Sequence, residues 1–166
     1  MPITLSTPHD ASAILTVYHL GIEFQKTVFH RHWFGFDEDL LIREISEGRH
    51  WKIMRDREIA CVFSVLFDDP VVWGPQEPSL YLHRIVTNPA FKGNAYVPEI
   101  IDWAKTYGRA RGQRYIRLDT FPDNEKLMNY YIRCGFRFCG IRAFGAEEVI
   151  PPHYRDGVSL FEMAIP

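Results

Sequence analysis

Cysteine is scarce in this 166-residue sequence, which contains only Cys61, Cys134 and Cys139 and no Cys-x-x-Cys pair. Three cysteines cannot form a closed disulfide framework, and their spacing does not indicate a zinc site. Long apolar runs are also missing, because no stretch approaches the roughly 20 residues of a membrane span. The first residues lack the basic segment of a secretory leader. We therefore expect a soluble, cytoplasmic protein.

An excess of charge of one sign is absent as well. The 19 Lys and Arg residues nearly balance the 21 Asp and Glu residues, for a formal net charge of −2. This balance argues against nucleic acid as a partner, and no segment predicts a membrane partner. The 46% hydrophobic content is too high for a disordered chain, and no repeat or linker interrupts it. We expect one domain over residues 1–166, which is long enough to bury its own core.

Two helices are predicted in the first third of the chain. Thr7 before Pro8 is typical of a helix start. That helix should run to about Lys26 and turn four apolar residues inward, namely Ile14, Val17, Leu20 and Ile22. A second helix is expected over Asp37–Ser46, ended by Gly48, with Leu40, Leu41, Ile42 and Ile45 as its apolar positions.

Strands dominate the middle of the chain. Trp51–Met54 and Glu58–Phe67 are expected to pair as an antiparallel hairpin, and the proline-rich segment Asp68–Pro78 to be a connecting loop. Leu80–Thr87 is apolar on both faces apart from His83 and Arg84, which is typical of a strand in the middle of a sheet. We expect Arg84 to point to the face opposite His83, where a carboxylate could pair with it.

The last third alternates helices and strands. A helix that begins near Val97 and stops at Gly112 leads into a strand over Tyr115–Asp119, so this strand should be parallel to the preceding one. Another helix is predicted over Asn124–Arg133. Phe136–Phe144 and Val158–Ile165 alternate like antiparallel strands. These elements predict a mixed α/β architecture around one sheet.

The segment Thr87–Trp103 carries the main functional signal. A strand runs into a turn that contains Lys92 and Gly93, and the turn leads directly into a helix. The free amides of such a helix start, with a lysine nearby, bind phosphate well. Taken alone, however, the segment fits an ordinary strand-to-helix connection better, with Gly93 serving only the turn.

Two blocks of the sequence resemble the GNAT superfamily of N-acetyltransferases. In the first, the family has V-x-P, an aromatic, a basic residue and three glycine-type positions, and this chain has Thr87-Asn88-Pro89, Phe91, Lys92, and then Gly93, Ala95 and Val97. The second block runs over residues 118–124 and continues with Tyr131 and Gly135-Phe136. The resemblance covers about Leu80–Phe144. It implies an α/β fold with a mixed, mostly antiparallel central sheet of six to seven strands flanked by about four helices.

The resemblance also implies an acyl-CoA-dependent N-acetyltransferase that moves an acetyl group from acetyl-CoA to a primary amine by direct transfer in a ternary complex, without a metal. It places the cofactor against Ile85, Val86, Thr87, Lys92, Gly93, Asn94, Ala95, Tyr96, Val97 and Asn124. The chain departs from the family pattern in keeping only Gly93 as glycine. The Cβ atoms of Ala95 and Val97 limit the approach of a pyrophosphate, and Pro98 removes one amide donor.

Tyr131 and His83 are the candidate catalytic residues. Tyr131 looks like the family's general acid, which protonates the departing thiolate, and Tyr130 or a plain core role for Tyr131 are the alternatives. His83 is the candidate base, because histidine ordinarily titrates near pH 6.5 and arylalkylamine acetyltransferases of the family carry histidine in an equivalent register. A packed, hydrogen-bonded histidine explains this position equally well.

The acceptor amine is predicted to contact the segment Phe29–Phe36, because the family's segment between its first two helices borders the acceptor site. Within and near it we assign acceptor contacts to Phe29, His32, Trp33 and Tyr81, and Tyr81 could equally be a packing residue. The acceptor is a small-molecule or peptide amine of unspecified identity. The oligomeric state is open, with a homodimer among the options.

Two other functions stay open on the sequence alone. One is a CoA-binding module that has lost catalysis, which the incomplete glycine motif would allow. The other is an unrelated nucleotide- or phosphate-binding α/β domain that shares only the strand, turn and helix.

Overall fold

The computed structural model describes residues 3–75 and 77–166. Its contacts divide the chain into two compact units. The first unit contains Met1–Val65 and His83–Ile100, and the second contains Leu66–Leu82 and Ile101–Pro166. The expectation of a single domain over the whole chain stays a prediction.

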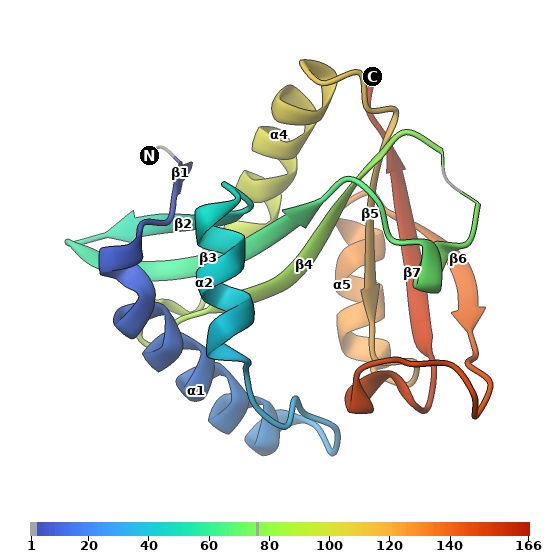
Figure 1. Cartoon of the computed structure of the whole chain (residues 1–166), viewed down its shortest axis with the longest axis horizontal. Coiled ribbons are helices and arrows are strands. Elements are labelled where there is room, and N and C mark those ends of the chain that lie inside the picture. Colours follow the sequence, from blue (N-terminus) through green and yellow to red (C-terminus); the bar gives the residue numbers. More distant parts are fainter. Residues whose placement is uncertain (1–2, 76) are drawn as a thin grey trace. The chain divides into compact units, whose positions relative to one another are not determined.

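The described residues form one seven-stranded sheet in the order β1-β2-β3-β4-β5-β7-β6 (Figure 1). Strand β4 pairs with β5 in parallel, whereas β1 with β2, β2 with β3, β5 with β7 and β6 with β7 pair antiparallel. The mixed, mostly antiparallel sheet and the central place of β4 are therefore confirmed. The strand bounds are β1 Ile3–Leu5, β2 His50–Arg55, β3 Glu58–Leu66, β4 Ser79–Thr87, β5 Tyr115–Thr120, β6 Arg137–Arg142 and β7 Val158–Ala164.

Two helices, α1 (Ala11–Val28) and α2 (Glu38–Ser46), pack on the strands of the first unit. Their shared core consists of Ile14, Val17, Tyr18, Leu41, Ile45, Ile59, Val62 and Val86. The prediction is wrong for two of the apolar helix positions, because Leu20 is 44% exposed and Ile42 is 51% exposed. The helical period of about 3.6 residues instead turns Gly21 and Glu44 inward, as continuations of the faces that carry Val17 and Leu41.

The local features around these elements follow from their sequences. Pro8 begins a short 3₁₀ turn, Pro8–Asp10, so the predicted helix start at Thr7 becomes this turn and α1 follows it. The β2–β3 hairpin turns at Asp56 and Arg57, whose φ angles of +49° and +67° are those of a two-residue type I′ turn. Gly48, with a φ of +68°, follows α2 as predicted.

The second unit places α5 (Glu125–Arg133) with strands β5, β7 and β6 (Figure 1). Asn124 caps α5, since its side chain accepts a hydrogen bond from Leu127 N at 3.2 Å. The segment predicted as a plain loop contains a one-turn helix, α3 (Pro70–Trp73), which begins at a proline and buries Val72. A further 3₁₀ turn covers Pro152–Tyr154.

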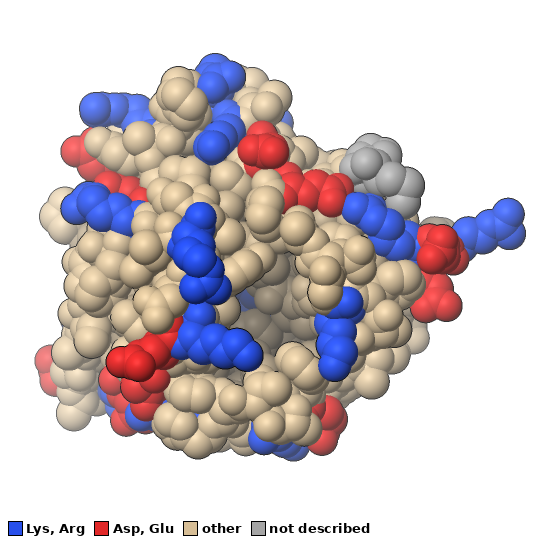
Figure 2. Space-filling view, turned by 180° about the vertical axis from the view of Figure 1, so that it is seen from behind, with Lys and Arg blue, Asp and Glu red and all other residues tan. Residues whose placement is uncertain are grey.

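Helix α4 (Tyr96–Arg109) follows β4 after the 3₁₀ turn Pro89–Phe91. Its buried residues include Ile100, Ile101 and Ala104, which lie on one face of the helix. None of the helices in residues 3–75 and 77–166 combines the length and apolar character needed to cross a membrane. Figure 2 shows Lys and Arg side chains interspersed with Asp and Glu on the face drawn, which accords with the formal net charge of −2.

Candidate functional site

The turn before α4 is open to solvent. Lys92, Gly93, Asn94 and Ala95 are all exposed, and α4 begins directly after them. Asn94 stabilises the turn by donating from its side-chain amide to the carbonyl of Phe91 at 2.7 Å. The chain therefore presents a short stretch of exposed backbone at the start of a helix, where main-chain N–H groups favour an anion.

Gly93 fits a phosphate-binding role by its conformation and its surroundings. Its φ of +88° lies in the region that side chains disfavour, and a Cβ built there would meet no atom within 4 Å. The space next to this backbone is thus open to a ligand oxygen. Pro98 lies in the first helical turn, where its missing N–H removes one of the donors that an anion could use.

Not every predicted cofactor residue has a side chain that is exposed to solvent. The Tyr96 side chain is 2% exposed, and its backbone N–H donates to Asn94 O at 3.1 Å. Lys92 projects from the exposed turn, and its Nζ lies 5.5 Å from the centroid of the Phe24 ring on α1. Val97 is partly buried. Within this segment Lys92 provides the positive charge, and residues 93–95 are exposed.

At the end of β4, main-chain groups rather than side chains are the candidate contacts for the cofactor. Val86 is 5% exposed and belongs to the core of the first unit, while Ile85 and Thr87 are partly exposed. The Thr87 hydroxyl donates to the Sγ of Cys61 at 3.8 Å. Burial raises the pKa of the Cys61 thiol to about 12, so this cysteine is not a thiolate nucleophile near neutral pH.

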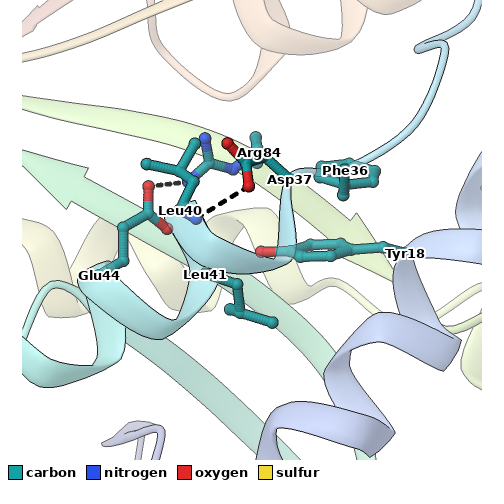
Figure 3. A pocket seen from close by; sticks show the side chains of 7 residues that line it. All are labelled: Tyr18, Phe36, Asp37, Leu40, Leu41, Glu44 and Arg84. Atoms are coloured by element: carbon teal, nitrogen blue, oxygen red, sulfur yellow. Dashed lines mark hydrogen bonds and ion pairs between the residues drawn. The ribbon is translucent and has the colours of Figure 1, made fainter.

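Arg84 interrupts the regular backbone of β4. Its φ is +48°, although a non-glycine residue in this region costs on the order of 1–3 kcal/mol. Its guanidinium binds the carboxylate of Glu44 on α2 (Figure 3). It also donates to Ser64 Oγ on β3 at 3.1 Å. The expected pairing of Arg84 with a carboxylate is thus confirmed.

A buried polar network continues from this pair. The Tyr18 hydroxyl lines the same small pocket as Glu44 and Arg84, and it hydrogen-bonds His50 Nε2 at 2.6 Å. His50 Nδ1 in turn hydrogen-bonds Ser6 Oγ at 2.7 Å. Burial raises the pKa of Tyr18 to about 12, and burial together with the Arg84 charge lowers the pKa of His50 to about 3. Both groups are therefore neutral at physiological pH.

His83 precedes Arg84 on β4 and is partly buried. Its carbonyl accepts a hydrogen bond from Ser64 Oγ at 3.4 Å, so Ser64 contacts the strand on both sides of the His83–Arg84 peptide. The backbone around the candidate base is thereby tied to β3.

Tyr81 lies in the interior of the second unit. It is 1% exposed, and its hydroxyl accepts a hydrogen bond from Arg117 Nη1 at 3.1 Å. Its ring centroid is 6.1 Å from that of Trp73. The structure thus gives Tyr81 packing partners, and its predicted contact with the acceptor stays a prediction.

Tyr131 is packed on α5 in the second unit. It is 8% exposed, and its ring lies 5.8 Å from Phe161 and 5.9 Å from Phe136 between centroids. Tyr130 is more exposed than its neighbour. Asn124 uses its side-chain oxygen to cap this helix, which makes it a structural residue whatever else it contacts. The two candidate catalytic residues, His83 and Tyr131, belong to different units.

The aromatic segment between α1 and α2 is partly anchored. Trp33 and Phe36 pack against the core of the first unit, and their ring centroids are 5.2 Å apart. His32 Nδ1 hydrogen-bonds the Trp33 carbonyl oxygen at 2.8 Å. Phe29 is partly buried against His30, at 4.3 Å between ring centroids. Phe29, His32 and Trp33 are each partly buried in one segment of the first unit, and their contact with the acceptor stays a prediction.

Comparison with known proteins identifies the family. The model of the acetyltransferase (GNAT) family matches residues 16–136. The chain belongs to this family. The match includes the Lys92–Ala95 turn, both candidate catalytic residues and the aromatic segment, so the resemblance inferred from the two sequence blocks is confirmed.

Individual GNAT-family relatives agree with this assignment. The chain is 32% identical over 146 residues to the uncharacterized N-acetyltransferase YesJ of Bacillus subtilis (strain 168), covering 82% of this chain and 81% of the relative. A GNAT-family acetyltransferase structure from Listeria monocytogenes 4b F2365 superposes with a TM-score of 0.79 at 22% identity, covering 98% and 94% of the two chains. The ribosomal-protein-S18-alanine N-acetyltransferase of Escherichia coli gives a TM-score of 0.70 at 13% identity, covering 99% and 93%. These two structures confirm the fold.

Sequence reasoning missed Glu44, Tyr18 and His50 in this GNAT-family chain. The available signal was positional, because Glu44 is three residues after Leu41 and thus falls on the inward face of α2. A charged residue on such a face needs a buried partner, and Arg84 in an otherwise apolar strand is the complementary charge. His50 gave no comparable signal, since it begins a strand that was predicted to start at Trp51.

Proposed function

We propose that this GNAT-family protein transfers an acetyl group from acetyl-CoA to a primary amine, by direct transfer in a ternary complex. The observation that carries the proposal is the exposed turn Lys92–Ala95 at the start of α4, where Gly93 has a positive φ and open space beside it. Such a turn suits a pyrophosphate, which accepts hydrogen bonds from main-chain N–H groups and is attracted by Lys92.

The proposal assigns the rest of the co-substrate to β4. The pantetheine arm lies along Ile85–Thr87 and pairs with the main chain as an added strand would. This assignment is supported by the partial exposure of Ile85 and Thr87, while Val86 faces the core. Binding through main-chain groups also explains how the chain tolerates side chains at Ala95 and Val97.

The proposed chemistry needs one base and one acid. His83 takes a proton from the amine, directly or through water, and the amine nitrogen forms a bond to the thioester carbonyl carbon. A backbone N–H near Ile85 or Val86 stabilises the oxyanion. The carbon–sulfur bond then breaks, and Tyr131 donates a proton to the leaving thiolate. The proposal assigns both proton transfers to these two side chains and gives no step to a metal ion.

The acceptor is proposed to be a small-molecule or peptide amine that contacts the aromatic segment around Phe29, His32 and Trp33. This proposal is supported by the partial exposure of all three side chains in one segment of the first unit. Aromatic walls favour cationic amines as well as apolar groups, so the segment suits both kinds of acceptor.

A thermal-shift titration with acetyl-CoA tests the proposal. A ligand that binds only the folded protein adds about 2.7 kcal/mol at 100 times its dissociation constant, so the melting temperature should rise. Gly93→Val should abolish most of that rise. Gly112→Val is the matched control, because Gly112 follows α4 with a φ of +70° and equally open space. Both variants are strained, but only the one at Gly93 should lose the response to acetyl-CoA.

The charge at Lys92 is tested separately. Lys92→Glu should weaken acetyl-CoA binding more at low salt than at high salt, because exposed charges are screened over about 8–10 Å at physiological ionic strength. Lys105→Glu, farther along α4, should leave binding unchanged. No response to acetyl-CoA or CoA would contradict the proposal. Binding without turnover across a panel of amines would indicate an inactive CoA-binding module, and a preference for ATP would indicate a nucleotide-binding domain.

A further inference from the structure

We propose that Glu44 is a positioning residue for the acyl transfer, because it holds Arg84 in the left-handed conformation that shapes β4 next to His83. This inference rests on the proposed function, since it concerns the strand to which we assign the base and the oxyanion donor. Glu44 itself lies on α2 and acts through Arg84 rather than on the substrate.

The backbone of β4 gives the first reason. Among the described residues, only Asp56, Arg57 and Arg84 combine a side chain with a positive φ. Asp56 and Arg57 form the turn of a hairpin, where this conformation is required. Arg84 is instead in the middle of a strand, where nothing in the local sequence favours it. A strained residue persists only where its surroundings hold it in place.

The contacts of the Arg84 side chain stabilise its strained backbone conformation. Its guanidinium binds Glu44 from α2 and Ser64 Oγ from β3 at 3.1 Å. Glu44 is only 3% exposed, and its neighbours Leu41 and Ile45 anchor α2 in the core. The carboxylate is therefore a fixed partner, and it fixes the guanidinium with a charge-assisted hydrogen bond.

The surroundings of the pair strengthen it. Figure 3 shows Tyr18 and Phe36 beside the start of α2, where they line the same pocket as Glu44 and Arg84. The two rings stack with centroids 3.9 Å apart, and the Tyr18 hydroxyl is held by His50 at 2.6 Å. Tyr18 and Glu44 are buried while the Arg84 side chain is 23% exposed, so the pair is partly shielded from solvent, and an ion pair in a less polar environment is stronger than one in solution.

The consequence for the reaction follows from the position of Arg84 in the chain. It lies directly between His83 and Ile85, so its φ and ψ set the directions of the His83 side chain relative to the next N–H groups. A change in this conformation would move the oxyanion donor relative to the base. Misplacement by about 1 Å can lower a reaction rate by about 100-fold.

The test compares two glutamates of the same helix end. Glu44→Gln removes the buried charge with little change in volume. Glu47→Gln is the matched control, because the more exposed Glu47 pairs at 2.5 Å with Arg49, whose guanidinium also lies 4.0 Å from Glu44, and does not contact Arg84. We expect Glu44→Gln to lower kcat by about 10- to 100-fold while the KM for acetyl-CoA changes by less than about twofold. Glu47→Gln should change neither value.

Hydrogen exchange gives a second readout that does not depend on activity. Glu44→Gln should speed amide exchange in residues 83–87 by about tenfold relative to wild type, because the strained conformation is released, and Glu47→Gln should not. If exchange in this segment is unchanged in Glu44→Gln, the inference is overturned. If the wild-type protein neither binds acetyl-CoA nor acetylates any amine, the proposed function fails instead, and exchange still decides whether Glu44 holds β4.

A double variant guards against a simple loss of stability. Glu44→Gln with Arg84→Gly removes both charges of the pair, and glycine adopts a positive φ without strain. We expect this variant to recover at least about threefold in kcat over Glu44→Gln alone, with faster exchange in residues 83–87 than wild type. A double variant that is no faster than the single one would overturn the inference, as would a folded Glu44→Gln with wild-type kcat.

Discussion

In each unit of the molecule an arginine on a strand pairs with a glutamate, and one partner of each pair is buried, Glu44 in the first unit and Arg117 in the second. Arg84 on β4 binds Glu44 in the first unit, and Arg117 on β5 binds Glu162 at 2.8 Å in the second. Both arginines also contact a hydroxyl group, from Ser64 and Tyr81 respectively. The chemistry of the two pairs is the same, but their backbones differ.

Arg117 sits in a regular strand whose register with β7 is unbroken from Tyr115 to Thr120. Its guanidinium also lies over the Trp73 ring at 4.6 Å, so the pair joins several elements of the second unit. In contrast, Arg84 has a left-handed backbone conformation, and it directly follows His83 in β4. We infer that the Arg117–Glu162 pair on ordinary backbone serves stability, whereas the strained backbone at Arg84 fits the positioning role proposed for Glu44.

Tyr131 is the residue that could break this comparison, because it would give the second unit a direct part in the chemistry. Tyr131→Phe keeps the ring among Phe136 and Phe161 and removes only the hydroxyl. We expect kcat to fall by roughly 10²–10⁴-fold with little change in acetyl-CoA binding, since a general acid typically contributes that much. Steady-state kinetics and a thermal-shift titration measure the two effects.

Tyr130→Phe on the same helix is the control and should retain wild-type kcat. An unchanged kcat in Tyr131→Phe, with chemistry shown to limit the rate, would leave Tyr131 as a core residue. The catalytic groups would then have to be sought in the first unit.

The polar network of the first unit also contains a histidine, His50, whereas Arg117 contacts Glu162, Tyr81 and Trp73. His50 has a pKa of about 3 in the folded protein and near 6.5 when unfolded. Between these values the unfolded chain binds a proton that the folded protein does not, so stability falls as the pH is lowered from about 6.5 towards 3. The full loss from this one group is on the order of 5 kcal/mol.

Urea unfolding at pH 7 and at pH 5 measures this contribution. His50→Gln should be less stable than wild type at pH 7 but lose less stability on acidification. His9→Gln replaces an exposed histidine and should follow the wild-type curve. Equal acid sensitivity of wild type and His50→Gln would show that His50 is not held neutral.

Much of this architecture was accessible from the sequence. Hydrophobic periodicity located the main helices and strands, and the two sequence blocks identified the family, because these signals are local. The error at Ile42 arose because Leu40, Leu41 and Ile42 are adjacent and only part of such a run can face inward. Leu20 lies between His19 and Gly21, and the inward face of α1 continues through Gly21 instead. The one-turn helix α3 was missed because four residues carry no measurable period.

The network around Arg84 was not accessible in the same way. Arginine has no intrinsic preference for a positive φ, so no local pattern could indicate the conformation of Arg84. Tyr18 and His50 are 32 residues apart in the chain, and only the folded structure brings them together. The candidate cofactor turn was predictable because it is continuous in sequence, whereas the support behind β4 is assembled from α1, α2, β2 and β3.

Arg117 offers a test of the structural half of the comparison. Removing one partner of a buried ion pair costs about 3–5 kcal/mol, so Arg117→Met should lower the free energy of unfolding by about that amount. The folded variant should keep its kcat within about twofold, in contrast to Glu44→Gln. Urea denaturation followed by far-UV circular dichroism, with kinetics at a temperature where the variant is folded, measures both.

Glu162 supplies an internal control for this experiment, because it also binds Arg137 at 2.9 Å. The Arg137 side chain is 72% exposed, whereas that of Arg117 is 8% exposed. Arg137→Gln should therefore leave the unfolding midpoint nearly unchanged. A large loss of kcat in folded Arg117→Met would mean that the second pair also supports the site, and the comparison would fail.

The smallest predicted effect comes from removing one buried serine hydroxyl group in each unit and comparing the two losses of stability. Ser6 Oγ hydrogen-bonds His50 Nδ1 at 2.7 Å in the first unit, and Ser159 Oγ donates to Pro122 O at 3.3 Å in the second. Each serine is buried, so Ser6→Ala and Ser159→Ala should each cost about 1 kcal/mol of unfolding free energy.

The two variants should differ in their pH dependence. Losing Ser6 removes a partner of the neutral His50 ring and should change the loss of stability between pH 7 and pH 5, whereas Ser159→Ala should show the wild-type loss. Identical pH profiles for both variants would mean that Ser6 does not support the neutral state of His50, and the network would end at Tyr18 and His50.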